Sequence, residues 1–119
     1  MNDIARSLTD KEVESLAAFY SATPFKAPVQ EFDAALADKG AVLHEEHCDK
    51  CHSAGGSDPQ DDAAILAGQW KPYMERQFEN MDTGLRIVPK RMKRKVDKLS
   101  AEDKQALVHY YASNRGGSE

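Results

Sequence analysis

The chain has 119 residues, which suits one small domain. Its hydrophobic share of 40% lies below that of most globular proteins, so the core is thin unless a large apolar cofactor adds to it. The net charge of −4 argues against general nucleic-acid binding, and no run of about 18 apolar residues is present that could span a membrane.

The first two elements that the sequence predicts are helices. Thr9–Glu12 matches a capping box, and the helix that it opens carries apolar residues at helical spacing as far as Tyr20. Residues 23–28, TPFKAP, end this helix because proline lacks an amide donor and restricts the residue before it. A second helix begins near Phe32 and runs into the cysteines, and Gly40 is expected to interrupt or loosen it.

The later elements are predicted to be helices and loops. Residues 53–62, SAGGSDPQDD, form a loop by composition, and Pro72 fits the first turn of a helix over roughly residues 71–81. A loop over residues 83–90 precedes a second capping box, Ser100–Asp103, which opens the last helix. The final GGSE tail is expected to fray. Because no strand alternation is present, the sequence predicts an all-α fold.

The two ends of the chain resemble each other when one is shifted by 91 residues. Helix periodicity explains the apolar matches, but it does not explain the shared spacing from a methionine to a cap to a pair of aromatic residues. The pattern therefore favours a partial internal repeat over two capped helices that are alike by chance. The matched pairs include Met1 with Met92, Leu8 with Leu99, Thr9 with Ser100, Leu16 with Leu107 and Tyr20 with Tyr111.

The segment HEEHCDKCH, residues 44–52, holds five side chains that can bind a metal. Within it, Cys48, Cys51 and His52 form the Cys-x-x-Cys-His pattern that is typical of c-type haem attachment. Two thiols three positions apart can reach the two vinyl groups of one porphyrin. The adjacent imidazole of His52 then supplies the proximal ligand to the iron.

Two other chemistries fit parts of the same segment. A structural zinc site takes four ligands, but it normally draws them from two separated pairs, and no second pair follows downstream. A thioredoxin-like dithiol needs a strand before the motif and a helix after it, whereas a helix is expected before it here. A zinc-binding module therefore stays open as a minor alternative to the haem site.

Three downstream segments, LAGQWKPYMERQF, GLRIVPKRM and LSAEDKQALVHYYAS, together with the motif above, strongly resemble the class I c-type cytochromes. The resemblance covers roughly residues 30–114 and is strongest to the two-haem c-four group and to the cytochrome subunit of flavocytochrome c sulfide dehydrogenases. It implies a class I cytochrome c fold wrapped around one covalently bound haem c over residues 30–119. Residues 1–29 then form an extra N-terminal helix and a Pro-containing linker, which resemble the tail of a preceding domain of the same kind.

The resemblance also implies ligands for the haem. Met92, which follows a loop with glycine and proline, inherits the role of the sixth iron ligand. Met74 and Met81 are expected to fill the core, and His109 to be a surface or packing residue. His44 and His47 lie on the proximal helix, so they cannot reach the distal face and are expected at its surface.

Further residues match family positions near the haem. A backbone carbonyl twelve residues after His52 orients the proximal imidazole in the family, and here Ala64 stands where the family has proline. Gln69, Tyr73 and Arg86 match positions beside the haem, and Tyr73 and Arg86 could bind its propionates, although Arg86 could equally be an exposed arginine. Trp70 is expected to pack in the core or against the haem wall.

The function that follows is an electron-transfer carrier with His52 and Met92 as axial ligands, not an enzyme in itself. It would be the C-terminal part of a two-haem cytochrome or a cytochrome subunit of a redox enzyme. An open sixth position, in contrast, would make a haem enzyme or a sensor of gases or sulfur ligands. Because haem c is normally attached outside the cytoplasm, a periplasmic location is expected, with the targeting segment removed or upstream.

Six cations in nine residues surround Met92 in this acidic chain: Lys90, Arg91, Lys93, Arg94, Lys95 and Lys98. A run of charges is most often a solvated surface. It also predicts an acidic docking surface on a redox protein partner, such as a sister haem domain or a flavoprotein subunit, because complementary charge steers fast and weak docking.

Overall fold

The computed structural model describes residues 1–116, and these form seven helices without a strand, so the predicted all-α fold is confirmed. Residues 117–119 of the tail that was expected to fray lie outside the described residues. In chain order the helices are α1 Asn2–Arg6, α2 Asp10–Ala22, α3 Ala34–His47, α4 Ser53–Gly56, α5 Lys71–Asp82, α6 Lys90–Val96 and α7 Ala101–Ser113.

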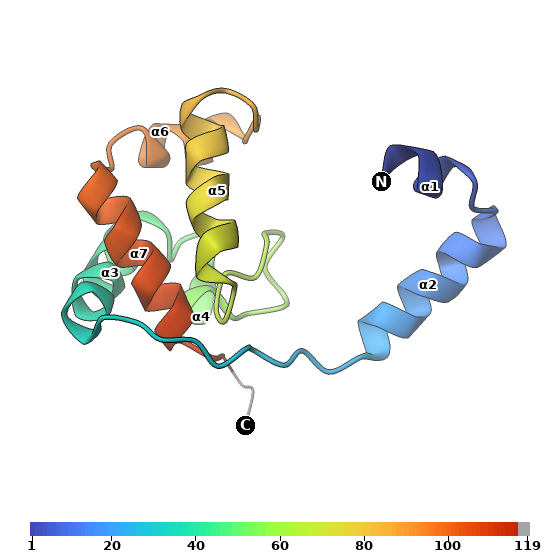
Figure 1. The fold of residues 1–119 in the computed structure, drawn as a ribbon, viewed down its shortest axis with the longest axis horizontal. Helices are drawn as coiled ribbons and strands as arrows, with labels where there is room; N and C mark the ends of the chain where they lie inside the picture. Colours follow the sequence, from blue (N-terminus) through green and yellow to red (C-terminus); the bar gives the residue numbers. More distant parts are fainter. Residues whose placement is uncertain (117–119) are drawn as a thin grey trace.

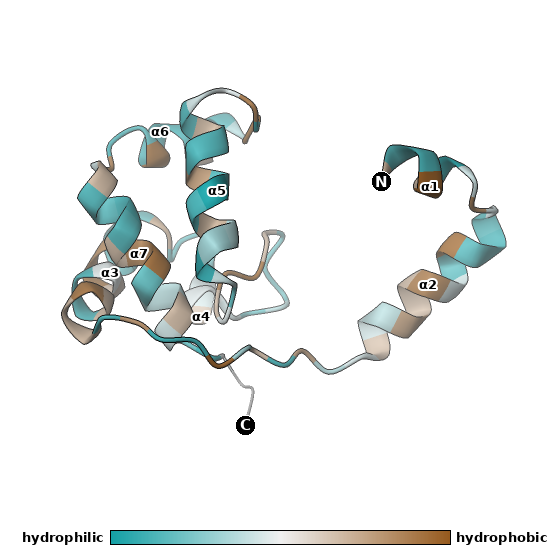
Figure 2. Cartoon of the chain, viewed as in Figure 1, coloured by the Kyte–Doolittle hydropathy of each residue, from teal (hydrophilic) through white to brown (hydrophobic). Residues whose placement is uncertain are grey.

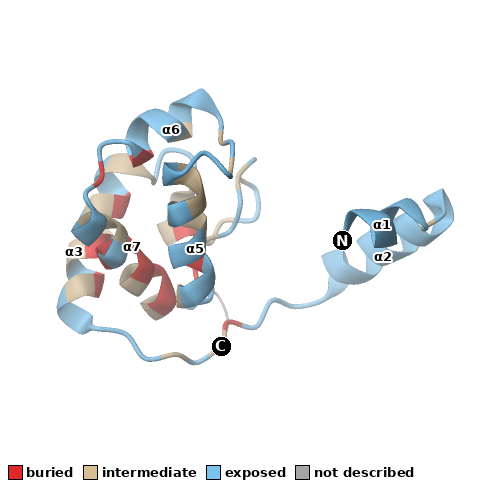
Figure 3. Cartoon of the chain, turned by 45° about the horizontal axis from the view of Figure 1, so that its top comes forward, coloured by how far each residue is buried: buried red, intermediate tan, exposed pale blue. Residues whose placement is uncertain are grey.

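The helices fall into two groups that an extended segment joins (Figure 1). Helices α3 to α7 gather into one body, whereas α1 and α2 lie apart from it at the end of the extended residues 23–33. Every residue of α1 and α2 is exposed (Figure 3). The coloring by hydropathy nevertheless shows brown, apolar positions along α2 (Figure 2).

The body is built on the packing of α3 against α7. Both helices approach closely at Gly40, where an added Cβ would lie 2.6 Å from the Cβ of Tyr110 and still closer to the carbonyl oxygen of Ala106. The expectation that Gly40 interrupts the helix is therefore wrong, because α3 is continuous through it and the missing side chain admits α7. The core beside this contact consists of Met74, Leu99, Leu107, Val108 and Tyr111.

Both predicted capping boxes are present. The Thr9 side chain accepts from the amide of Glu12, whose carboxylate accepts in return from Thr9, and Ser100 and Asp103 repeat this arrangement. The helices that they open, Asp10–Ala22 and Ala101–Ser113, are related by the same shift of 91 residues that relates the two ends of the sequence. The two ends therefore share helix length as well as sequence pattern.

Three short helices were not predicted. Helix α1 precedes the first capping box, α4 occupies the first four residues of the predicted loop 53–62, and α6 begins at the last residue of the predicted loop 83–90. Helix α6 consists mostly of cationic residues, so its sequence shows no clear apolar periodicity. Its one buried residue is Val96. Phe32 also lies outside α3, because the side chain of Asp33 caps the helix by accepting from the amide of Leu36.

Candidate functional site

The Cys-x-x-Cys-His segment follows directly on the end of α3. Cys48 is the C-cap residue of that helix, and its carbonyl oxygen accepts from the amides of Cys51 at 3.1 Å and His52 at 3.0 Å. This turn leaves both thiols free, with Cys51 exposed and Cys48 half-buried. Burial raises the pKa of the Cys48 thiol, and a hydrogen bond with Tyr111 partly offsets that rise.

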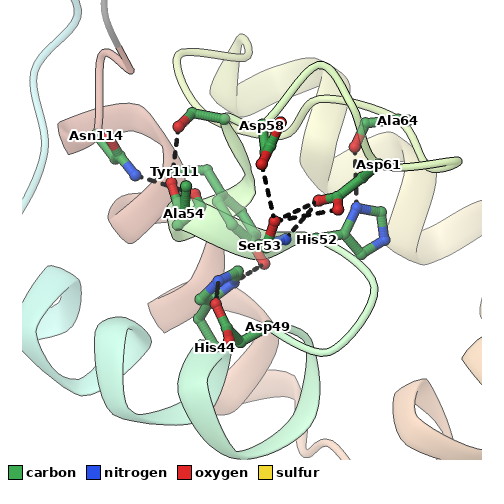
Figure 4. Close-up of polar contacts among 12 residues, drawn as sticks. His44, Asp49, His52, Ser53, Ala54, Asp58, Asp61, Ala64, Tyr111 and Asn114 are labelled. Carbon is green, nitrogen blue, oxygen red and sulfur yellow. Dashed lines mark hydrogen bonds and ion pairs between the residues drawn. The ribbon is translucent and has the colours of Figure 1, made fainter.

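The imidazole of His52 is oriented by a backbone carbonyl. Its Nδ1 atom lies 2.9 Å from the carbonyl oxygen of Ala64, which is the contact expected of this position (Figure 4). A proton on Nδ1 makes the ring a donor there and leaves the lone pair of Nε2 for a metal. The turn after His52 is held by Asp61, whose carboxylate accepts from both the amide and the hydroxyl of Ser53.

His44 lies in the core and not at the surface, so that expectation is wrong. The side chain is only 3% exposed, and its Nδ1 atom lies 2.9 Å from the hydroxyl oxygen of Tyr111 on α7. Its Nε2 atom has no hydrogen-bond partner and lies 3.5 Å from a carboxylate oxygen of Asp49. Burial lowers the pKa of His44, which favours the neutral imidazole, and the Asp49 carboxylate opposes that shift.

The signal that could have found this pair is the spacing of Ala37, Gly40 and His44, which are the buried residues of α3. They recur at i, i+3 and i+7 and so share one face of the helix. The charged residues Glu45 and Glu46 follow directly in the sequence and made this face difficult to recognise as buried. His47, in contrast, is half-buried beside Glu46, 3.7 Å from its carboxylate.

The residues that the family resemblance places near a haem lie on and before α5 and in the loop after it. Trp70 is 55% exposed and Tyr73 is 47% exposed, so Trp70 does not pack in the core of the chain. The side chain of Gln69 turns back to accept from the Trp70 amide at 3.0 Å. Arg86 is half-buried and donates to the side-chain oxygen of Gln77, so it is not a freely exposed arginine.

The methionines differ in burial. Met74 belongs to the core cluster, as expected, and Met81 lies half-buried in the wall of a cavity of about 140 Å³. Met92 is half-buried in the first turn of α6 and so stands on a short helix and not in the loop itself. The Nδ1 atom of His109 accepts from the backbone amide of Asp33 at 2.8 Å, which makes it a packing residue.

A zinc site finds no support in this arrangement. Among residues 1–116, no three His, Cys, Asp or Glu side chains come together in a way that could hold a metal ion. A structural zinc ion needs four such ligands. His44, which would be one of them, is already engaged with Tyr111.

The same arrangement does fit a covalently bound haem. Two free thiols lie on one turn, and an oriented imidazole follows them. Large apolar side chains of the same body are also exposed, as they would be if a large apolar group completed the core. The exposed apolar side chains are Ile65, Trp70, Tyr73, Leu85 and Ile87.

Comparison with known proteins decides the family. A family model described as "Cytochrome C oxidase, cbb3-type, subunit III" matches residues 35–110, which is more than half of the chain. The chain belongs to this cytochrome c family. It is thus a c-type cytochrome domain of class I, an electron-transfer domain that binds haem c covalently.

Solved structures agree with this assignment. The cytochrome domain is 26% identical to reduced recombinant cytochrome c4 from Pseudomonas stutzeri, with a TM-score of 0.74, over 93% of this chain and 64% of that one. Cytochrome c4 from Acidithiobacillus ferrooxidans is similar in fold, with 20% identity and a TM-score of 0.72, over 95% of this chain and 70% of that one.

The chain therefore spans slightly less than two thirds of the length of the Pseudomonas protein. No curated protein sequence matches it. The likeness to the cytochrome subunit of sulfide dehydrogenases stays a prediction.

Proposed function

We propose that this domain carries electrons through one haem c, attached at Cys48 and Cys51, with His52 and Met92 as the axial ligands of the iron. The observation that carries the proposal is the 2.9 Å contact between His52 Nδ1 and the Ala64 carbonyl. It fixes the ring directly after the two thiols and leaves its second nitrogen available to bind a metal. Haem c supplies one-electron chemistry between ferrous and ferric iron.

Met92 is the best candidate for the sixth ligand on three grounds. Met74 is buried in the core, and His109 is occupied by the amide of Asp33, so neither side chain is available. Met92 is half-buried after the loop that carries the exposed Leu85 and Ile87. The family resemblance assigns the ligand to this position. With both axial positions filled, no site is left on the iron for a substrate, so the domain is a carrier.

We also propose that the chain is the C-terminal part of a two-haem cytochrome. Helix α2 has the length and the cap of α7, and its Leu16 and Tyr20 correspond to Leu107 and Tyr111. Leu107 and Tyr111 are buried against the body, whereas Leu16 and Tyr20 are exposed. An exposed apolar face on a capped helix suits the last helix of a preceding domain. A cytochrome subunit of a redox enzyme is the other assembly that this chain would suit.

The partner would dock at the cations of Lys90–Lys98 with an acidic surface. Of these cations, Lys93 is paired with Asp97 at 2.7 Å, while the neighbouring Arg91, Arg94 and Lys95 are exposed. Their positive field surrounds Met92 and would steer an acidic redox protein to this side of the haem. A periplasmic location is proposed on the ground of haem c alone. No helix of residues 1–116 has the length and the apolar character to cross a membrane.

Visible spectra test the ligand assignment. The protein is matured in a host that attaches haem c, and oxidised and reduced spectra are recorded for the wild type, Met92→Ala and the control Met81→Ala. The wild type and the control should show the weak long-wavelength band of a methionine–iron bond when oxidised, and Met92→Ala should lose it and bind carbon monoxide when reduced. Loss of the band in Met81→Ala, or a wild type that binds carbon monoxide rapidly, would contradict the assignment and favour an open site.

A further inference from the structure

The extended residues 23–33, called the strap below, are fastened to the body that follows them (Figure 1). Ala27 is only 6% exposed although its neighbours on the strap are more open. It lies against Gly68, where an added Cβ would come within 2.5 Å of the Ala27 Cβ. At the other end, the amide of Asp33 donates to His109 of α7.

Between these two points, the side chain of Gln30 binds the backbone on both sides of Trp70. Its Nε2 donates to the carbonyl oxygen of Gln69 at 2.8 Å, and its Oε1 accepts from the amide of Lys71 at 3.0 Å. Lys71 is the first residue of α5, so its amide has no partner within the helix. The N-cap residue Trp70 offers no side-chain acceptor, and Gln30 supplies the cap from 41 positions earlier in the chain.

Trp70 lies between the two backbone groups that Gln30 binds. The residue is 55% exposed, so it is only partly covered by the rest of the chain. Its own amide is bound to the side chain of Gln69, and its carbonyl accepts from the amide of Met74. Gln30 joins the residue before Trp70 to the residue after it and ties both to the strap.

We propose that Gln30 is a positioning residue for the haem: by holding the backbone around Trp70, the strap sets the place of the indole against the haem. This inference rests on the proposed function, because it requires a haem bound to this domain, and it takes Trp70 to pack against that haem. Gln30 itself need not touch the haem. A residue that served only as a helix cap would protect Lys71 without affecting the distance between the indole and the haem.

Trp70 is the single tryptophan of the chain, so its fluorescence reports this position alone. A bound haem quenches a nearby indole by energy transfer, and the quenching weakens as the distance grows. The experiment compares haem-loaded wild type, Gln30→Ala and Glu31→Ala. Glu31 is the exposed neighbour on the same strap and is the matched control. The two readouts are amide hydrogen exchange at Lys71 and tryptophan emission.

In Gln30→Ala, exchange at Lys71 should become about fivefold faster, because one hydrogen bond of ordinary net strength is worth about that factor in a local opening equilibrium. Tryptophan emission should rise in the same variant, and Glu31→Ala should match the wild type in both readouts. Should Gln30→Ala fail to fold, Gln30→Glu replaces it. That variant keeps the acceptor for Lys71, loses the donor to Gln69, and should still raise the emission.

Unchanged emission in both Gln30 variants overturns the proposal, even if Lys71 exchanges faster, because Gln30 is then a helix cap only. Emission that rises as much in Glu31→Ala overturns it as well. Failure of the proposed function is recognised separately. It gives a protein without a haem spectrum, whereas exchange at Lys71 reports the strap whether or not haem is bound.

Discussion

Replacing Gly40 with alanine should destabilise the domain, because the contact between α3 and α7 leaves no room for a methyl group. The added Cβ would lie 2.6 Å from the Cβ of Tyr110 and closer still to the carbonyl oxygen of Ala106, whereas carbon atoms prefer separations of about 3.5–4.0 Å. Overpacking typically costs about 1–3 kcal/mol. The upper end applies here because a backbone oxygen of α7 cannot rotate away as a side chain can.

Alanine also favours the helix over glycine by about 1 kcal/mol, so the net loss in the free energy of unfolding should be about 2 kcal/mol. With an unfolding entropy of about 2.1 cal/mol/K per residue, this lowers Tm by roughly 8 °C. Thermal unfolding of the haem-loaded protein, followed by far-UV circular dichroism, measures the change. Asp38→Ala, at an exposed position of the same helix, is the control and should stay within about 0.5 kcal/mol of the wild type. A Gly40→Ala protein with an unchanged or higher Tm would refute the packing argument.

Three further outcomes follow from the contacts. The Lys39 ammonium, with Ser100, holds the pKa of the Asp103 carboxyl at about 2, so its stabilising effect is present above the unfolded pKa of about 4 and is lost as the pH falls toward 2. Asp103→Asn should therefore flatten the fall of Tm over that range, and an unchanged slope would contradict this. Tyr111→Phe should cost about 1–3 kcal/mol by leaving the buried His44 Nδ1 without a partner, and His44→Phe should cost less in that background than alone. If the losses in unfolding free energy, measured with denaturant, simply add in the double variant, an interaction between His44 and Tyr111 would be contradicted. Arg94→Glu should slow electron transfer to an acidic partner in stopped-flow experiments, with the difference shrinking as salt is added, and a rate that ignores both changes would exclude docking at this surface.

Features that depend on neighbours in the sequence were predictable. Both capping boxes form because their hydrogen bonds join residues three positions apart, so Thr9 and Ser100 carry the information locally. The Cys-x-x-Cys-His turn is equally local. The carbonyl of Ala64 was found through the family pattern, since nothing in the composition of the intervening loop brings it to His52.

Features that depend on distant partners were missed or misjudged. By its intrinsic propensity, the glycine at position 40 weakens a helix. The sequence does not show that α7 approaches α3 closely at this residue, which is why a glycine is needed there. His44 stands among charged residues in the sequence, yet Tyr111 supplies the hydrogen bond that allows it to be buried. The cap that Gln30 provides for α5 joins positions that are 41 residues apart, and no local sequence pattern predicts it.

A carrier of this kind holds its haem iron on both sides with ligands from the chain. The decisive experiment is a reductive titration of the matured protein, followed by visible spectra with and without carbon monoxide. We expect covalent haem c that is reduced and reoxidised reversibly in a single one-electron step, with a reduced spectrum that carbon monoxide does not change. Rapid formation of a carbon monoxide complex would show an open sixth position, and a colourless protein from a competent host would exclude a haem carrier altogether.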